Sequence, residues 1–116
     1  MQAFYKLEEI VRTQLVSGAA YQEFLRAPAM SCGVYTLAAG ATDTQKPHAE
    51  DELYYVIDGA ARMMVYNDKG AEQRAVGAGD IIFVKAGQEH RFYEITRDLV
   101  VLVIFAPAES MAKVQL

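Results

Sequence analysis

Several residue types are scarce in this sequence, and each scarcity narrows what the protein can be. Its 116 residues include one cysteine, no tryptophan and only two histidines. A single cysteine excludes an intrachain disulfide and fits a reducing compartment, and Cys32 is expected to be an inert, buried thiol. Basic residues are also in deficit, with 11 Lys and Arg against 15 Asp and Glu. The resulting net charge of -4 argues against nucleic acid or an anionic membrane as a partner.

Long hydrophobic runs are missing as well. The most apolar segment, residues 99–108, is well short of the roughly 20 residues that a membrane-spanning helix needs. Residues 1–6 lack the basic region and the apolar run of a secretion signal. The expectation is therefore a cytoplasmic protein that does not interact with membranes.

What the sequence does contain is typical of an ordered protein made of strands. Hydrophobic residues make up 53%, and seven tyrosines and five phenylalanines favour strands. Short β-prone runs recur between turn residues, which predicts an all-β sandwich or barrel. The predicted strands are Ser31–Leu37, Leu53–Ile57, Ala60–Tyr66, Glu72–Val76, Asp80–Val84, His90–Ile95 and Leu99–Phe105. Asp58-Gly59 is interpreted as the turn of a hairpin joining the second and third of these strands.

One domain is expected, with a lead-in and a tail. Residues 4–15 have helix-like apolar spacing, and residues 21–26 are ambiguous between strand and helix. The predicted organisation is a lead-in over residues 1–29, packing on the barrel or a partner subunit, a barrel over 30–106, and a C-terminal tail over 107–116.

Ligand-type side chains cluster in the stretch Lys46 to Gly59. His48, Glu50 and Glu52 occupy alternate positions immediately before a β-prone run, so an extended chain would place them on one face. An imidazole and two carboxylates facing inward would carry a large desolvation cost unless a cation accompanied them. The pattern favours a metal site, and two unrelated surface histidines are the alternative interpretation.

The other histidine, His90, follows the loop residues 85–89 and begins a predicted strand. Neutral imidazole together with carboxylate suits a divalent ion such as iron, manganese, nickel or zinc. The residues alone do not choose between these ions.

Two motifs in this chain resemble those of the cupin family. The family patterns are G-x5-H-x-H-x3,4-E-x6-G and G-x5-P-x-G-x2-H-x3-N. The positions that match are Gly40, His48, Glu52 and Gly59 in the first motif and Gly79, Gly87 and His90 in the second. This resemblance covers roughly residues 30 to 106 and implies a double-stranded β-helix, or jelly-roll barrel.

The resemblance also implies a ligand set. His48, Glu52 and His90 match family positions that bind a metal inside the barrel. The first motif histidine falls on Lys46, however, and a protonated lysine cannot bind a metal. The resemblance therefore leaves the fourth position open, with Glu50 as a ligand or as an acceptor beside the ligands.

The expected function is that of a metal-binding, single-domain cupin acting on a small molecule. Dioxygenase and isomerase or lyase chemistry both remain open, and Glu50 and Tyr54 are the expected acid/base residues. The alternative is a non-catalytic cupin that binds a small ligand or serves as a sensor. Apolar residues on the outer face of the predicted sheet suggest a homodimer.

Overall fold

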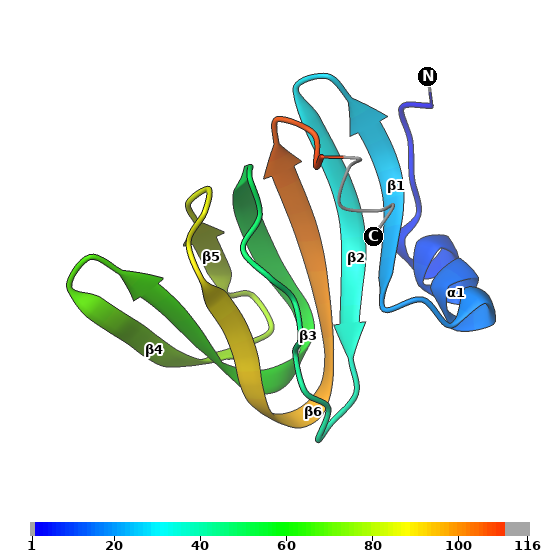
Figure 1. Ribbon diagram of the computed structural model, residues 1–116. Coiled ribbons are helices and arrows are strands. Elements are labelled where there is room, and N and C mark those ends of the chain that lie inside the picture. Colours follow the sequence, from blue (N-terminus) through cyan, green and yellow to red (C-terminus); the bar gives the residue numbers. More distant parts are fainter. Residues whose placement is uncertain (1, 111–116) are drawn as a thin grey trace.

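The structure is a computed structural model that describes residues 2–110. It contains one helix and six strands, all paired antiparallel (Figure 1). These elements are α1 (Leu7–Ser17), β1 (Tyr21–Ala27), β2 (Met30–Leu37), β3 (Asp51–Asn67), β4 (Gly70–Gly77), β5 (Ile81–Val84) and β6 (His90–Ala106). The strand order is β1-β2-β6-β3-β4, and β5 pairs with the first half of β3 on the same edge as β4. The all-β jelly-roll prediction is confirmed.

Two long strands, β3 and β6, organise the molecule. Each has 17 residues and a bend, so the sheet folds over itself and encloses an interior (Figure 1). The first half of β3 pairs with β5 and with the end of β6, whereas its second half pairs with β4 and with the start of β6. Because of this pairing, residues that are far apart in the sequence face the same interior.

The predicted hairpin at Asp58-Gly59 is wrong, because β3 continues through these residues as one strand. The pairing of β3 with β6 shifts register here, which marks a bulge rather than a turn. Gly59 has a φ of 106°. A Cβ at Gly59 would overlap the backbone of Asp98 and Leu99. The glycine is needed for this close approach at the bend. The predicted strands at 90–95 and 99–105 are likewise one strand, β6.

The core lies between the two halves of the folded sheet. Side chains alternate on either side of the bend in β3 and in β6, so that every second residue there points inward. The most completely buried of these inward residues are Tyr54, Val56, Phe92, Leu99, Val101 and Val103. Helix α1 packs outside, where the Gln14 amide donates hydrogen bonds to the carbonyl oxygens of Ala20 and Val34. The helix found among residues 2–110, α1, has 11 residues and is too short to span a membrane.

The outer surface of the sheet has an apolar area on β3 and β5. Leu53, Tyr55, Ile81 and Phe83 are all exposed there, and register places them side by side. Cys32 is buried on β2, and burial raises the pKa of its thiol, as expected for an inert cysteine. The predicted homodimer through the apolar area stays a prediction.

Candidate metal centre

His90 is the first residue of β6, and its ring is buried in the interior. Its Nδ1 lies 2.9 Å from the carbonyl oxygen of Gln88, which can only accept, so Nδ1 carries the proton. In the neutral ring Nε2 therefore presents a lone pair to the interior. Burial lowers the pKa of His90, but contact with the Glu52 carboxylate and the Gln88 carbonyl outweighs burial and raises the pKa overall.

Glu52 comes from the first half of β3, where it points into the same interior. It is 2% exposed, and its Oε1 lies 3.2 Å from His90 Nε2. Oε1 accepts no well-aligned hydrogen bond from the residues that the structure describes. A buried carboxylate oxygen without such a partner is costly. A cation bound beside it would remove that cost.

His48 approaches from the segment that precedes β3. The Gly87 N–H donates a 2.7 Å hydrogen bond to the His48 carbonyl oxygen, and the His48 ring packs edge-on against Phe105 at 4.9 Å between centroids. His48 Nε2 lies 3.9 Å from Glu52 Oε1. On the other side of the ring, Nδ1 lies 3.2 Å from Oε2 of Glu109. A carboxylate at Nδ1 stabilises the tautomer in which Nε2 is available as a ligand.

The structure thus brings together the three side chains expected to be metal ligands. One ligand atom from each of His48, Glu52 and His90 lies within 4.8 Å of the others. Two imidazole nitrogens and a carboxylate oxygen suit a divalent ion such as zinc, iron, nickel or manganese. This donor set, together with the buried Glu52 oxygen, fits a metal ion.

Tyr54 follows Glu52 by two residues on β3 and points to the same site. Its hydroxyl donates to Gln45 Oε1 at 2.9 Å and lies 3.0 Å from His90 Nε2. Burial and the nearby Glu52 carboxylate raise the pKa of Tyr54 well above its usual value. The phenol is therefore protonated at neutral pH.

The sequence predicted that His48, Glu50 and Glu52 share one face of an extended strand. This holds only in part, because β3 begins at Asp51, after Glu50. Glu50 is buried, but it does not belong to the described group of ligand atoms formed by His48, Glu52 and His90. Its expected acid/base role stays a prediction. Lys46, at the position of the missing motif histidine, is exposed.

Three polar residues at the site were not identified from the sequence. Gln45 contacts both His48 and Tyr54, Asp43 is buried behind Gln45, and Glu109 contacts His48. Glu109 lies within the predicted tail, of which residues 111–116 fall outside the described residues. No local pattern could have revealed the Glu109 contact, since Glu109 follows His48 by 61 positions along the chain.

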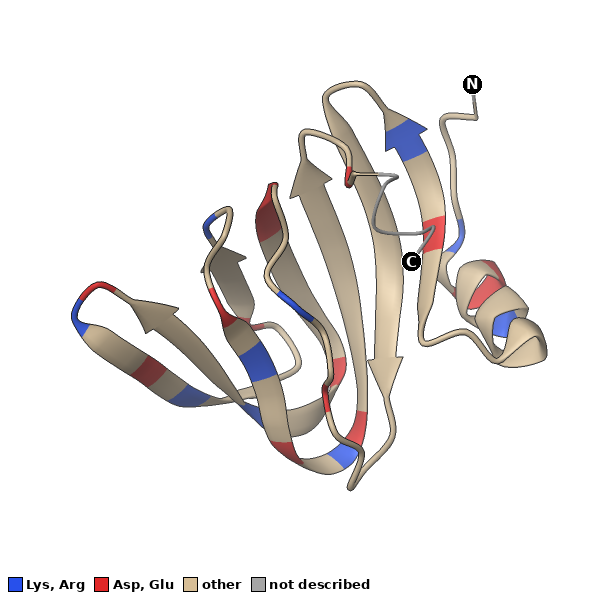
Figure 2. Ribbon diagram, viewed as in Figure 1, with Lys and Arg blue, Asp and Glu red and all other residues tan. Residues whose placement is uncertain are grey.

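A small cavity of about 160 Å³ opens beside these side chains. Its polar lining includes Gln45, His48, Glu52, Tyr54 and Glu109, and Val103 and Phe105 form an apolar wall. The neighbouring strand β2 and the second half of β6 contain no charged residue (Figure 2). The Tyr21 hydroxyl is buried at the cavity and has no hydrogen-bond partner among residues 2–110. A ligand in the cavity could accept a hydrogen bond from this hydroxyl.

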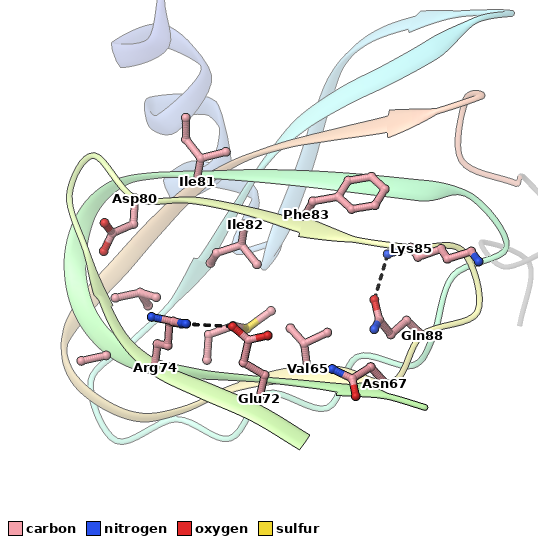
Figure 3. Close-up of a pocket in the computed structure, with 13 residues that line it drawn as sticks. Val65, Asn67, Glu72, Arg74, Asp80, Ile81, Ile82, Phe83, Lys85 and Gln88 are labelled. Atoms are coloured by element: carbon pink, nitrogen blue, oxygen red, sulfur yellow. Dashed lines mark hydrogen bonds and ion pairs between the residues drawn. The ribbon is translucent and has the colours of Figure 1, made fainter. Parts of the chain in front are cut away.

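A groove of about 730 Å³, larger than the small cavity, lies between β5 on one side and β3 and β4 on the other (Figure 3). Ile82 points into it, whereas the charged side chains Glu72 and Arg74 pair with each other. None of His48, Glu52 and His90 lines this groove. The small cavity is therefore the candidate site.

Comparisons with known proteins agree with this fold. The family model for the cupin domain matches residues 33–105. The uncharacterized protein SCO3923 of Streptomyces coelicolor is 46% identical over 110 residues, which cover 95% of this chain and all of that protein.

Among solved structures, oxalate decarboxylase OxdC of Bacillus subtilis superposes with a TM-score of 0.69 at 24% identity over 75% of this chain. The hydroxypropylphosphonic acid epoxidase of S. wedmorenis gives a TM-score of 0.61 at 17% identity over 73% of this chain. This chain spans only 25% of the decarboxylase and 49% of the epoxidase, so these two likenesses concern the fold alone. Sequence motifs, jelly-roll architecture and the match over residues 33–105 agree, and the chain belongs to the cupin family.

Proposed function

We propose that this cupin is a metal-dependent enzyme that converts a small molecule in the cavity beside His48, Glu52 and His90. The observation that carries the proposal is the convergence of these three ligand atoms within 4.8 Å, from two places far apart in the sequence, residues 48–52 and residue 90. A divalent ion in such a site supplies Lewis acidity or a binding position for dioxygen. Dioxygenase chemistry and isomerase or lyase chemistry are both compatible with it.

The cavity limits the substrate. Its volume of about 160 Å³ is below the roughly 300–1,000 Å³ of sites for drug-sized ligands. Val103 and Phe105 offer an apolar surface to one side of the substrate, and the Tyr21 hydroxyl offers a hydrogen bond to an oxygen of the substrate. A compact molecule with oxygen functions at one end fits this lining.

Tyr54 is the main candidate for proton transfer. Its hydroxyl lies beside the ligand atoms, and its raised pKa keeps the proton on the phenol. Tyr54 would therefore first act as a general acid, giving its proton to an oxygen or carbon of a substrate in the cavity. Glu50 is the second candidate, because it is a buried carboxylate on the approach to β3.

Metal analysis of protein purified without chelator tests the proposal. The wild type should contain about one divalent ion per chain, and the double variant His48→Ala/His90→Ala should contain none above background. Free metal at 100 times its dissociation constant should also stabilise the wild type by about 2.7 kcal/mol. Equal metal content in the two proteins would contradict the proposal.

A second candidate function, binding without conversion, is favoured by the contact between Glu109 and His48. This contact places the segment after β6 at the cavity, where Glu109 is part of the lining. A thermal-shift screen of small acids, sugars and phenols, with and without metals, would provide candidate ligands. A ligand that stabilises the metal-loaded protein and is recovered unchanged after long incubation, with and without oxygen, supports a binding module.

A further inference from the structure

A glutamine lies where the motif's first histidine is missing. Gln45 lines the cavity, while the next residue, Lys46, is exposed. The Gln45 Oε1 atom lies 3.5 Å from His48 Nε2 and 2.9 Å from the Tyr54 hydroxyl. Gln45, one position before the motif's first histidine, thus points inward in place of that histidine.

The orientation of this amide is fixed by a buried carboxylate. Gln45 Nε2 donates a 2.7 Å hydrogen bond to Oδ2 of Asp43, which directs Oε1 towards the site. Asp43 is held in turn by the Tyr35 hydroxyl at 2.8 Å and by the Phe92 N–H at 2.9 Å. Rotating the amide by 180° would place Oε1 against the Asp43 carboxylate and lose the Gln45–Asp43 hydrogen bond. These hydrogen bonds therefore keep Gln45 Oε1 directed towards the ligand atoms.

Five polar atoms of the interior form a closed series in which each atom is close to the next. Successive separations are 3.5, 3.9, 3.2, 3.0 and 2.9 Å, in the order Gln45 Oε1, His48 Nε2, Glu52 Oε1, His90 Nε2, Tyr54 hydroxyl and back to Gln45. Two ligands that are each about 2.1 Å from one ion, at angles of 90–110°, lie about 3.0–3.4 Å apart. The gap between Gln45 and His48 falls close to that range.

We propose that the Gln45 amide oxygen is the fourth protein ligand of the divalent ion, in place of the absent histidine. This inference rests on the proposed metal site and names a ligand that the family motif does not supply. An amide oxygen is a harder donor than an imidazole nitrogen. The exchange shifts the preference of the site towards ions that favour oxygen ligands, such as manganese.

Cobalt binding to the full chain tests the fourth ligand without any assay of activity. Co²⁺ is titrated into metal-free wild type and into Gln45→Met, with visible absorption reporting coordination and chelator competition reporting affinity. Because a direct ligand is lost, Gln45→Met should bind Co²⁺ more weakly by at least the roughly 10–100-fold that loss of a supporting partner costs, with an altered absorption spectrum. The matched control is Lys46→Met, which changes an exposed neighbour and should leave both affinity and spectrum unchanged.

A second variant covers the case in which Gln45→Met does not fold. Gln45→Asn keeps an amide for packing but withdraws its oxygen by one methylene, so it should weaken Co²⁺ binding in the same way. Wild-type affinity and spectrum in the folded Gln45 variants would overturn the fourth ligand and leave the three-residue site intact. A wild type that binds Co²⁺ no better than His90→Ala does would instead contradict the proposed function itself.

Discussion

The groove and the small cavity of this barrel differ in how far their polar groups are exposed to water. The groove between β4 and β5 is the larger, but its ion pair is solvated, with the Arg74 side chain 77% exposed and that of Glu72 59% exposed. Beside the small cavity lie a carboxylate and an imidazole that are almost fully buried, Glu52 and His90. Water solvates the charges of the groove, whereas Glu52 Oε1 is buried without a hydrogen-bond partner among residues 2–110. The burial of these possible metal ligands, rather than the volume of the cavity, identifies the site.

The bend in β3 separates these regions. The half before Gly59 contributes Glu52 and Tyr54 and lies between β5 and β6, with one edge of the strand paired to each. The half after it contributes Met63 and Val65 to the groove and pairs with β4, most of whose residues are exposed. One strand therefore supplies a buried polar site and an open groove.

The largest expected effect is loss of metal on neutralising the buried carboxylate. Glu52→Gln should weaken metal binding by more than the roughly 10–100-fold that loss of a supporting partner costs, because a direct ligand is changed. The same substitution in the groove, Glu72→Gln, is the matched control and should leave affinity unchanged. Chelator competition measures both, and a larger loss in Glu72→Gln would reverse the comparison.

The bend itself is the next test. Gly59→Ala should lower the free energy of unfolding by about 2 kcal/mol or more, because Cβ would overlap the backbone of β6 and φ is positive. Gly70→Ala shares a positive φ, but nothing lies within 4 Å of the new Cβ, so its cost should be smaller. Denaturant unfolding compares them. Equal costs would show that the close approach at the bend is unimportant.

The support of His48 by Glu109 predicts an intermediate effect on metal affinity. Glu109→Ala removes the carboxylate at Nδ1 and should weaken metal binding about 10-fold or more, with little change in metal-free stability. Glu89→Ala, in the exposed loop before His90, serves as the control. If both variants bind metal as the wild type does, Glu109 does not position His48.

Removal of the Tyr54 hydroxyl separates binding from proton transfer. Tyr54→Phe leaves Gln45 Oε1 without the hydrogen bond from the Tyr54 hydroxyl, so metal-free stability should fall by about 1 kcal/mol. His48, Glu52 and His90 remain, so the variant should still bind metal. Calorimetric unfolding with and without metal measures both effects. Complete loss of metal would instead make Tyr54 an essential ligand.

The smallest effect is expected in the groove. Arg74→Ala removes an exposed ion pair with Glu72 and should change stability by no more than about 0.5 kcal/mol, with no change in metal affinity. Denaturant unfolding and the same chelator competition measure these quantities. A clear loss of metal in Arg74→Ala would mean that the groove takes part in the site.

The sequence predicted most strands and the three central side chains because these signals are local. Alternation and turn residues indicate strands, and motif spacing singled out His48, Glu52 and His90. The hairpin at Asp58-Gly59 failed because an Asp-Gly pair has two uses. It can close a turn, or it can admit another strand at a bulge, and only the distant Asp98–Leu99 backbone decides between them.

The remaining parts of the site depend on contacts that no local pattern contains. The register of the segment before β3 places Gln45 inward and Lys46 outward, and Asp43 sets that register by accepting the Phe92 N–H of β6. Glu109 reaches His48 because the chain after β6 passes back over β1 and β2, where its N–H donates to Ser31 and its carbonyl accepts from Arg26. The inward position of Gln45 and the contact of Glu109 with His48 both result from tertiary packing.

The location of a bound ion tests the central claim most directly. Crystals of the protein grown with Mn²⁺ or Co²⁺ and measured at the metal's absorption edge would show the ion by anomalous scattering. The account predicts one strong peak per chain, within bonding distance of His48 Nε2, Glu52 Oε1 and His90 Nε2. No peak at these atoms, or a single peak in the groove beside Glu72 and Asp80, would contradict it.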